Sequence, residues 1–313
     1  MPYNNVISRT DASALIPEDV AAQIIKRLPE ASAALSLFRH VTMSQAQQRM
    51  PVMAALPVAY FVNGDTGLKQ TSEASWANKY LNAEEIATIV PVPEAVLDDT
   101  AFDIWAEVQP FMVEAIGRTL DAAIFFGTNA PATWPGAIVP GATTAGNVVT
   151  EGTATPEQGG VTGDISALFA EVEADGYDVN GIVAQRTFKG LLRQARATTG
   201  QQLDPGAGQG ATDSIYGVGI NYPLRGLWPT GTGAAQMVAG DFTQAILAIR
   251  QDLTWKLLDQ AVLTDNSGVV TYNLPQQDMV AMRVVARFAW QIAQTPTPEN
   301  VAGGYPFAVL KGA

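Results

Sequence analysis

The chain has 313 residues, which is enough for one large domain or two interleaved domains with a sizeable core. Its net charge of −12 and the lack of any basic run argue against tight nucleic-acid binding, because phosphate contacts need Lys and Arg. The absence of cysteine excludes disulfides, thiolate nucleophiles and cysteine metal sites. Only 15% of the residues are charged, against about a quarter in an ordinary soluble domain. This favours a chain that covers part of its surface with partner copies.

Residues 1–50 predict an extended arm that carries one helix. Residues 17–19, Pro-Glu-Asp, suit a helix start, since proline fits the first turn and acids complement the positive helix end. The apolar stripe that follows consists of Val20, Ile24, Ile25 and Leu28, and Pro29 ends it. An ordinary amphipathic helix packed on its own core is the alternative. The chain lacks both a signal-peptide pattern and an apolar run of about 18 residues, so we expect no membrane and a soluble, reducing compartment.

Residues 51–93 predict two strands joined by a long polar turn. The apolar run PVMAALPVAYFV leads into the stretch FVNGDTGLKQTSEASW, and the strand-like run WANKYLNAEEIATIVPVP leaves it. Proline cannot donate to a strand ladder, so these strands are expected at sheet edges or with interrupted pairing. The prolines concerned are Pro51, Pro57, Pro91 and Pro93. A polar hairpin of this length is typical of a lid, a decorative loop or an arm that grips another molecule.

Residues 98–127 carry the strongest helical pattern. Apolar residues recur at spacings of three and four, and they are Phe102, Trp105, Val108, Met112, Ile116, Leu120 and Ala123. Asp98, Asp99 and Thr100 are expected to cap the start of this helix, and residues 127–129 to stop it. Pro110 is expected to kink the helix or restart it, because proline removes one backbone hydrogen bond.

The middle of the chain mixes short helices, one buried strand and loops. The predicted pieces are a loop or weak strands over 130–162, a helix over 164–176 capped by Asp164, a strand over 182–184, a helix over 186–196 and a flexible loop over 198–214. The last hundred residues turn to strand, and residues 280–292 alternate regularly enough for one long strand with one dry face. A final short strand follows a proline-bounded linker. Helix and strand are intermixed, so the predicted class is α+β.

Few residues predict chemistry. His40 is the single histidine, so neither a serine–histidine nor a histidine–carboxylate constellation can be built. The carboxylates Asp98, Asp99 and Asp103 suit helix capping better than metal binding. The glycines of 206–210 lack the preceding strand and following helix of a dinucleotide site, and the phosphate-loop and nucleophile-elbow motifs are absent. Arg250 and Asp252 predict a structural ion pair. The sequence therefore predicts no enzyme, no cofactor and no metal.

The order of the pieces carries more information than any single motif. The stretches concerned are SALIPEDVAAQIIKRLPEASAALSLFRHV, MPVMAALPVAYFVNGDTGLKQTSEASWANKYLNAEEIATIVPVPEAVLDD, DIWAEVQPFMVEAIGRTLDAAIFFGTNAPATWPGAI, GDFTQAILAIRQDLTWKLL, NLPQQDMVAMRVVARFAWQI and YPFAVLKG. In this order they resemble the N-terminal arm, extended loop, spine helix and C-terminal strands of tailed-phage major capsid proteins, the family whose fold is named after phage Hong Kong 97. The resemblance covers nearly the whole chain.

The resemblance implies an α+β Hong Kong 97 (HK97) capsid fold. Its implied parts are an N-terminal arm over 1–50, an extended β-hairpin loop over 51–93, a peripheral domain with the spine helix over 94–129, an axial domain over 130–275, the long peripheral strand over 276–298 and a strand returning to the axial domain over 299–313. Copies would form pentamers and hexamers in an icosahedral phage head that encloses double-stranded DNA without sequence-specific binding. Assembly would take place in the host cytoplasm.

The implied subunit interface uses the loop and the arm. Expected apolar anchors are Phe61, Leu68, Trp76 and Tyr80, with Ile24 and Phe38 from the arm. Polar or charged rim residues are Asp65, Lys69 and Glu73. Trp76 has an alternative, namely packing inside its own hairpin. The implied partners are other copies of the chain, a separate scaffolding protein, a portal and a decoration protein.

Two departures from the family pattern matter. Some members join a loop lysine to a neighbour's asparagine with a glutamate as base, whereas Asp278 and Val285 lie near those two positions here. We therefore expect no self-catalysed isopeptide bond at Lys69. Some members also carry a long cleavable segment ahead of the arm, whereas this chain starts almost at the arm. We expect either that this segment has been removed or, as Met1 suggests, that a separate scaffolding protein does its work.

Two other functions stay open at this point. An encapsulin-type shell subunit shares the fold but packages enzymes, and its reduced extended loop fits the long hairpin less well. An unrelated enzyme with residues 52–93 as a lid would need a pocket of perturbed carboxylates.

Overall fold

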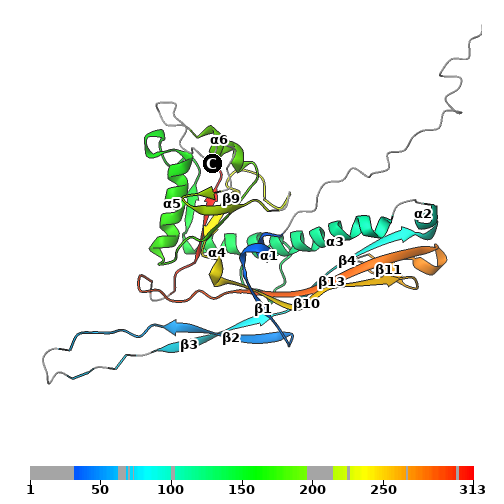
Figure 1. The fold of residues 1–313 in the computed structure, drawn as a ribbon, viewed down its shortest axis with the longest axis horizontal. Helices are drawn as coiled ribbons and strands as arrows, with labels where there is room; N and C mark the ends of the chain where they lie inside the picture. The colour runs from blue at the N-terminus through cyan, green and yellow to red at the C-terminus, as the bar shows by residue number, and fades with distance from the viewer. Residues whose placement is uncertain are drawn as a thin grey trace, which may run out of the picture.

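The computed structural model describes residues 32–62, 68–69, 71–72, 74–99, 103–195, 214–223, 226–265, 267–300 and 303–313. Figure 1 shows a long flat lobe, a rounder lobe beside one end of it, and a two-stranded hairpin that projects from the long lobe. The helix predicted over 17–28 lies outside the described residues, as does nearly all of the loop predicted over 198–214. The intermixed helices and strands confirm the predicted α+β class.

The long lobe is built on a four-stranded sheet with the order β1-β10-β13-β4. These strands are β1 (Arg39–Thr42), β10 (Ala245–Leu258), β13 (Met279–Ile292) and β4 (Glu84–Pro93). Strands β10, β13 and β4 run antiparallel to one another, while β1 joins β10 in parallel. The proline-bearing strand β4 lies at the edge of this sheet, as the sequence predicts. A smaller sheet pairs β11 (Val262–Thr264) with β12 (Val270–Asn273).

Strand β13 confirms the long strand predicted over 280–292. The prediction that only one face of this strand is buried is wrong. Val284, Ala286 and Phe288 are buried on the face toward the helices, as expected. Ala281, Val285 and Ala289 on the opposite face are buried as well. Ala289 packs with Leu81, Met43 and Ala248, so part of the covering of this second face comes from the hairpin.

The hairpin is shorter than predicted and contains only the first part of the strand-like run. Strand β2 (Gln47–Ala55) pairs antiparallel with β3 (Ser75–Asn82), and Gln47 lies opposite Asn82. At Ala83 the chain leaves the hairpin and continues as β4, which pairs with β13 in the four-stranded sheet. The run predicted as one strand is therefore two strands in two different sheets.

The helix along the long sheet is α3 (Ile104–Asp121), which passes into a π-helical turn over Ala122–Phe126. Its N-cap is Asp103, whose side chain accepts a hydrogen bond from Ala106 N (3.1 Å). The predicted caps Asp98 and Asp99 are wrong, because both residues belong to a separate short helix, α2 (Glu94–Asp99). Pro110 does not restart the helix, which runs continuously through it. Gly127 ends the π-helical turn in the left-handed conformation, as expected for a helix stop.

The round lobe is built on a six-stranded sheet with the order β5-β14-β9-β6-β8-β7. Its strands are β5 (Val148–Thr150), β14 (Phe307–Lys311), β9 (Ala235–Gly240), β6 (Gly181–Ala184), β8 (Val218–Asn221) and β7 (Ser214–Ile215). One face packs on α5 (Val161–Ala174) and α6 (Phe188–Gln194) through residues such as Ile182 and Leu168. The other face packs on α4 (Ile138–Ala145).

Two predictions in this lobe need correction. The stretch 130–162 contains the helix α4, which the sequence analysis took for loop or weak strand because it is rich in Gly, Ala and Thr. Asp164 does not cap α5, because it lies within the first turn. Its carboxylate accepts hydrogen bonds from the backbone nitrogens of Gly152 (2.8 Å) and Ala154 (2.7 Å), and so anchors the preceding loop. The strand at 182–184, the helix within 186–196 and the final strand are confirmed.

Candidate assembly surfaces

The hairpin exposes a row of large side chains on one face. Trp76 is 66% exposed and lies opposite Met53, while Tyr80 is 48% exposed and lies opposite Arg49. Beyond the paired strands, Phe61 is fully exposed and Leu68 is 90% exposed. Trp76 is therefore not packed inside its own hairpin, and this face offers apolar surface to another molecule.

The opposite face of the hairpin is held against the long lobe. Leu81 and Val52 are buried, and Met50 packs beside Leu81. Lys79 reaches across to the end of β13, where its Nζ donates to the carbonyl of Ile292 (2.9 Å). Nζ also donates to Gln294 Oε1 (3.4 Å). Burial lowers the pKa of Lys79, which indicates that this ammonium lies in a partly dry contact.

A second set of hydrogen bonds fixes the junction between the hairpin and the sheet. Asn82 Nδ2 donates to the carbonyl of Thr133 (2.9 Å), and Trp134 Nε1 donates to the carbonyl of Asn82 (3.0 Å). Thr133 Oγ1 donates to Glu84 Oε1 (2.6 Å). The 133–134 turn thus holds the residues on both sides of Ala83, and with Lys79 it fixes the direction in which the hairpin leaves the lobe.

The arm is anchored by a buried carboxylate on α3. Asp121 accepts hydrogen bonds from Ser32 Oγ (2.6 Å), Ala33 N (2.9 Å) and Ala34 N (3.1 Å). These groups begin the short helix α1 (Ala33–Leu37), so Asp121 satisfies backbone donors that the helix itself cannot. Burial raises the pKa of Asp121 to about 6, although the three donors act in the opposite direction.

Phe38 is a core residue rather than an interface residue. It is 5% exposed, and its ring lies 6.0 Å from that of Phe125 and 5.9 Å from that of Phe242. Its prediction as a contact to a neighbouring copy is therefore wrong, because its own chain surrounds it. Three other predicted interface residues, Ile24, Asp65 and Glu73, lie outside the described residues. Lys69 is exposed.

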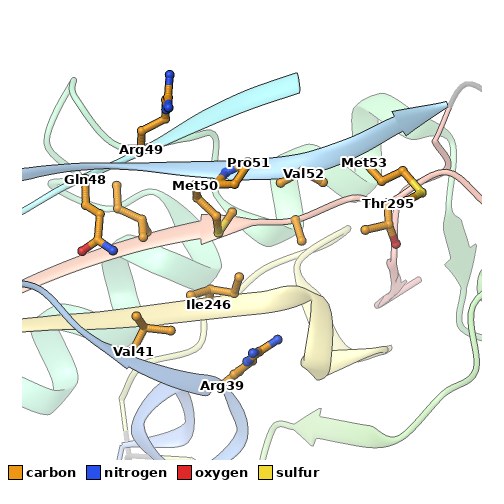
Figure 2. Close-up of a pocket in the computed structure, with 12 residues that line it drawn as sticks. Arg39, Val41, Gln48, Arg49, Met50, Pro51, Val52, Met53, Ile246 and Thr295 are labelled. Atoms are coloured by element: carbon orange, nitrogen blue, oxygen red, sulfur yellow. The ribbon is translucent and has the colours of Figure 1, made fainter. Parts of the chain in front are cut away.

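A groove of about 400 Å³ runs between the hairpin and the long sheet. Figure 2 shows Met50 and Val52 of β2 on one side and Val41 and Ile246 on the other. Arg39 and Arg49 also line it, and its lining contains no Asp, Glu or His among the residues that the structure describes. The groove therefore lacks the acid–base groups of an active site under a lid. Among the described strands β2 pairs with β3 alone.

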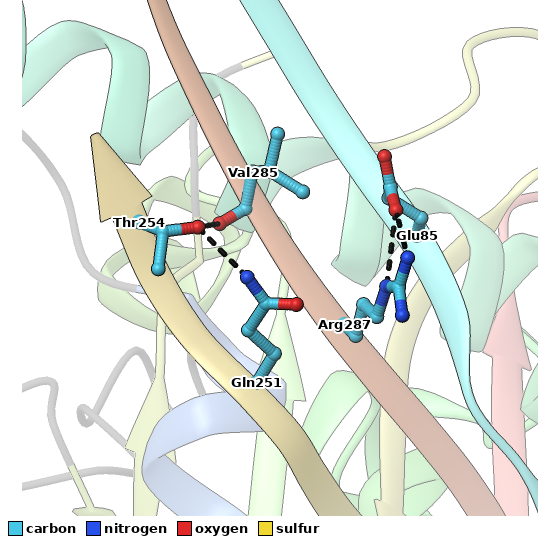
Figure 3. Close-up of polar contacts among 5 residues, drawn as sticks. All are labelled: Glu85, Gln251, Thr254, Val285 and Arg287. Carbon is cyan, nitrogen blue, oxygen red and sulfur yellow. Dashed lines mark hydrogen bonds and ion pairs between the residues drawn. The ribbon is translucent and has the colours of Figure 1, made fainter. Parts of the chain in front are cut away.

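The outer face of the long sheet carries structural polar contacts instead of a catalytic cluster. Figure 3 shows Arg287 of β13 paired with Glu85 of β4, with Nη2 and Oε2 2.7 Å apart. The predicted pair of Arg250 and Asp252 is not formed in the part of the chain that the structure describes. Both side chains are exposed on β10, as the alternation predicted, but the pairing of β10 with β13 is irregular between Ile249 and Thr254.

The region predicted to lack cross-linking chemistry is described only in part. Lys69 is exposed on the hairpin, Asp278 lies in the turn before β13, and Val285 is a buried residue of β13. A buried valine offers no carboxylate that could act as a base. The prediction that no isopeptide bond forms therefore stands as a prediction.

The described residues contain few features of other functional classes. His40 is exposed on β1, and no group of three or more His, Cys, Asp or Glu that could hold a metal occurs among them. None of the helices in the described ranges is both long and apolar enough to cross a membrane.

The sequence analysis missed a second exposed apolar surface at the far end of the long lobe. Leu257 of β10, Val262 of β11 and Val270 of β12 are each more than half exposed. The sequence marked this run as strand, but it did not show that these side chains are left exposed by the rest of the described residues.

Comparisons with known proteins agree with the geometry. Residues 12–296 match the phage capsid family. The major capsid protein of Staphylococcus phage 80alpha is 25% identical over 297 residues, which cover 93% of this chain and 85% of that protein. A solved structure from Microbacterium phage Oxtober96 superposes with a TM-score of 0.84 at 38% identity, over 99% of this chain and 100% of that one. One from Mycobacterium phage Bobi superposes with a TM-score of 0.85 at 30% identity, over 99% of each chain.

The chain therefore belongs to the phage capsid family. It is a major capsid protein with the HK97 fold, a structural component of the virion that assembles into multimeric shells, and it is not an enzyme. These findings do not favour the encapsulin alternative. The enzyme with a lid is excluded as well, so the hairpin belongs to a shell protein.

Proposed function

We propose that copies of this chain form pentamers and hexamers that close an icosahedral phage head around double-stranded DNA. In this arrangement the hairpin lies on a neighbouring copy, and the round lobe faces the axis of each ring as an axial domain. The long lobe is then the peripheral domain, with α3 as its spine. Membership of the phage capsid family supports the shell, and the exposed hairpin supports the mode of contact.

The observation that carries the proposal is the apolar outer face of the hairpin. A two-stranded hairpin is marginal in water by itself, and the face with Trp76 and Tyr80 has no cover from its own chain in the described residues. Burial of apolar area contributes roughly 25 cal/mol per Å². A neighbouring copy that covers Phe61, Leu68, Trp76 and Tyr80 therefore stabilises both the hairpin and the shell.

The rest of the proposed interface is polar or carried by the arm. The proposed rim consists of the exposed Lys69 together with Asp65 and Glu73, and each ion pair that it makes with the neighbouring copy contributes about 0–1 kcal/mol. Ile24 adds an apolar contact from the arm. Many contacts of this size, repeated by symmetry, allow errors in assembly to be corrected before the shell closes.

The packaged DNA is proposed to be held without sequence-specific contacts. The net charge of −12 and the lack of basic runs disfavour tight binding to phosphates. An acidic shell protein instead tolerates DNA close to its surface without trapping it. The proposed partners beyond the shell itself are a separate scaffolding protein, a portal and a decoration protein, with assembly in the host cytoplasm.

Mass photometry of the purified chain tests this proposal. We expect pentamers, hexamers or closed shells of the 33.1 kDa chain, either for the chain alone or after co-expression with the neighbouring phage genes. A monomer or dimer that persists at high concentration under both conditions would contradict it.

A further inference from the structure

The round lobe carries opposite charges at the two ends of one pair of strands. Strands β6 and β8 run parallel, with Ile182 opposite Ile220. Asp178 precedes β6 and Tyr216 precedes β8, so both lie at the starting end of the pair. Arg186 follows β6, so it lies at the finishing end. The two groups of residues therefore occupy opposite sides of the lobe.

The charge along the sequence is segregated in the same way. Between Arg118 and Arg186 the chain has no Lys or Arg. The acids in that interval are Asp121, Glu151, Glu157, Asp164, Glu171, Glu173, Asp175 and Asp178. Lys189, Arg193 and Arg196 then follow Arg186 without an intervening acid. Of these acids, Asp121 belongs to α3 and Glu151 follows β5 at the same end of the sheet as Arg186. The acidic side of the lobe is therefore formed by the acids between α5 and β6, which include Glu173 and Asp178, and the basic side by the cations that follow β6.

The acidic side contains a hollow of about 390 Å³. Its lining includes Phe169, Val179, Val218, Tyr216, Glu173 and Asp178. Neither Glu173 nor Asp178 has a side-chain hydrogen bond or ion pair within the described residues. We call this hollow the acidic socket.

The wall of the acidic socket is held in place although it is exposed. The ring of Tyr216 is 5.7 Å from that of Phe169 in an edge-on arrangement, and its hydroxyl donates to the carbonyl of Thr162 (3.1 Å). An aromatic wall, an apolar floor and two carboxylates match a side chain with an apolar stem and a cationic end. Arg and Lys have this shape, and their stems pack on apolar surface while the charge stays near carboxylates.

The basic side presents such side chains from α6 and the turn before it. Arg186 and Arg193 are exposed. Lys189 Nζ lies 4.1 Å from the centre of the Tyr222 ring, and Arg193 Nε donates to the Lys189 carbonyl (3.3 Å). These cations thus project from an ordered helix whose own apolar residues, Phe188 and Leu192, are buried.

We propose that the basic side of α6 in one copy docks on the acidic socket of the next copy within a ring. This inference rests on the proposed function and names the surfaces that hold its rings together. Because the two surfaces differ and lie on opposite sides of one lobe, the contact is head-to-tail, and repeated head-to-tail contacts close a ring when the rotation allows it. Charge complementarity also orients two approaching copies so that the basic side of one faces the acidic socket of the other. It makes ring formation sensitive to salt.

The native chain has no cysteine, so site-specific cross-linking tests the contact directly. Ala170→Cys lies in the socket lining and Thr187→Cys lies beside Arg186; both positions are exposed and uncharged. With a short bismaleimide reagent, assembled double variants give a ladder of covalent oligomers up to five or six copies on a denaturing gel. Each single variant gives no ladder. Monomers only, from double-variant shells of normal appearance, would overturn the inference and leave the proposed function intact.

Charge reversal supplies the second test. Glu173→Arg and Arg193→Glu each reduce the yield of rings or shells at least tenfold, while circular dichroism shows that the monomers stay folded. The combined variant has the native net charge and restores most of the yield. Native-like yields from both single variants, or no rescue in the combined one, would overturn the inference. Failure of the native chain itself to form any ring would instead contradict the proposed function.

Discussion

Asp121 shows how a single buried carboxylate ties the start of the ordered arm to the long helix. It accepts three hydrogen bonds from residues almost ninety positions earlier in the chain, and it is fully buried. Burial raises its pKa from 3.8 to about 6. The sequence offered no signal for this role, because an aspartate near the end of a helix has no visible partner without the fold.

The raised pKa of Asp121 predicts a pH dependence of stability. Between pH 4 and pH 6 the folded chain holds a proton that the unfolded chain releases, so the contribution of Asp121 to stability is largest at low pH. That contribution falls as the pH rises through about 6, by about 1 kcal/mol between pH 5 and pH 7. Urea unfolding of the monomer and of Asp121→Asn at these pH values measures it. The difference between the two proteins is expected to change with pH; a constant difference would refute the assignment.

Truncation to alanine is predicted to reduce monomer stability at Phe38 and shell yield at Trp76. Phe38 is buried between two aromatic rings, so Phe38→Ala is expected to lower the free energy of unfolding by about 3–5 kcal/mol. Trp76 is exposed, so Trp76→Ala is expected to change monomer stability by less than about 0.5 kcal/mol. The same variant is expected to lower shell yield strongly. Denaturant unfolding and particle counts measure both, and normal shells from Trp76→Ala would remove it from the interface.

Lys69 is predicted to form no covalent bond to a neighbour. It is exposed, but the position expected to supply a base is the buried Val285. Assembled shells boiled in denaturant are therefore expected to run as a single band of the monomer mass. A ladder of bands that disappears in Lys69→Arg shells would show that another group supplies the base.

The exposure of a single residue was easier to predict from the sequence than its contacts with residues far away in the chain. Trp76 and Tyr80, which the sequence predicted as interface anchors, are exposed in the single chain, as an interface position requires. Phe38 was misassigned because the residues that bury it come from positions 125 and 242. Lys79 went unnoticed for the same reason, since its partners lie beyond position 290.

Among the secondary-structure elements, the hairpin is firmly attached to the long lobe only at the end where its strands meet the four-stranded sheet. Its inner face is buried on the long sheet, and hydrogen bonds at Lys79 and Asn82 hold the residues nearest the junction. Toward its far end, the large side chains of Phe61 and Leu68 are exposed. The attached end therefore sets the direction in which the hairpin projects. In the proposed shell, a neighbouring copy covers the exposed far end.

Removal of the Lys79 ammonium is predicted to weaken the attachment of the hairpin to the long lobe. Lys79→Met keeps the apolar stem but loses the hydrogen bonds to Ile292 and Gln294. A loss of about 1 kcal/mol is expected, which increases opening of the hairpin about fivefold. Hydrogen–deuterium exchange of Gln47–Ala55 and Ser75–Asn82 in the unassembled chain measures it. Lys256→Met on exposed β10 is the matched control and should leave the hairpin unchanged; equal exchange in both variants would show that Lys79 does not contribute to this attachment.

The elements that the sequence predicted well are those with strong periodicity. Strand β13 and helix α3 were found from alternation and from three- and four-residue spacing. Helix α4 was missed because its Gly, Thr and Pro residues weaken the helical signal, while burial of Ile138 and Ala142 stabilises it. The division of β3 from β4 could not be predicted, since each half takes its partner from a different part of the chain.

At the scale of the whole molecule, the two lobes share one hydrophobic core. Residues of α3, such as Ile116 and Leu120, pack in the same cluster as Val238 and Val309 of the six-stranded sheet. The described lobes are thus one folded unit, from which the hairpin stands out. The order of the sequence pieces was sufficient to predict this family, whereas the surfaces that join copies could be chosen only once exposure was known.

Electron microscopy of the purified chain, with and without the co-expressed neighbouring phage genes, tests the central claim most directly. We expect flat pentameric and hexameric rings or closed shells tens of nanometres across, with an interior that is empty or filled with DNA. Shells filled with a cargo enzyme would contradict the proposed phage head. Uniform small particles at high concentration, even with the neighbouring gene products present, would contradict the account as a whole.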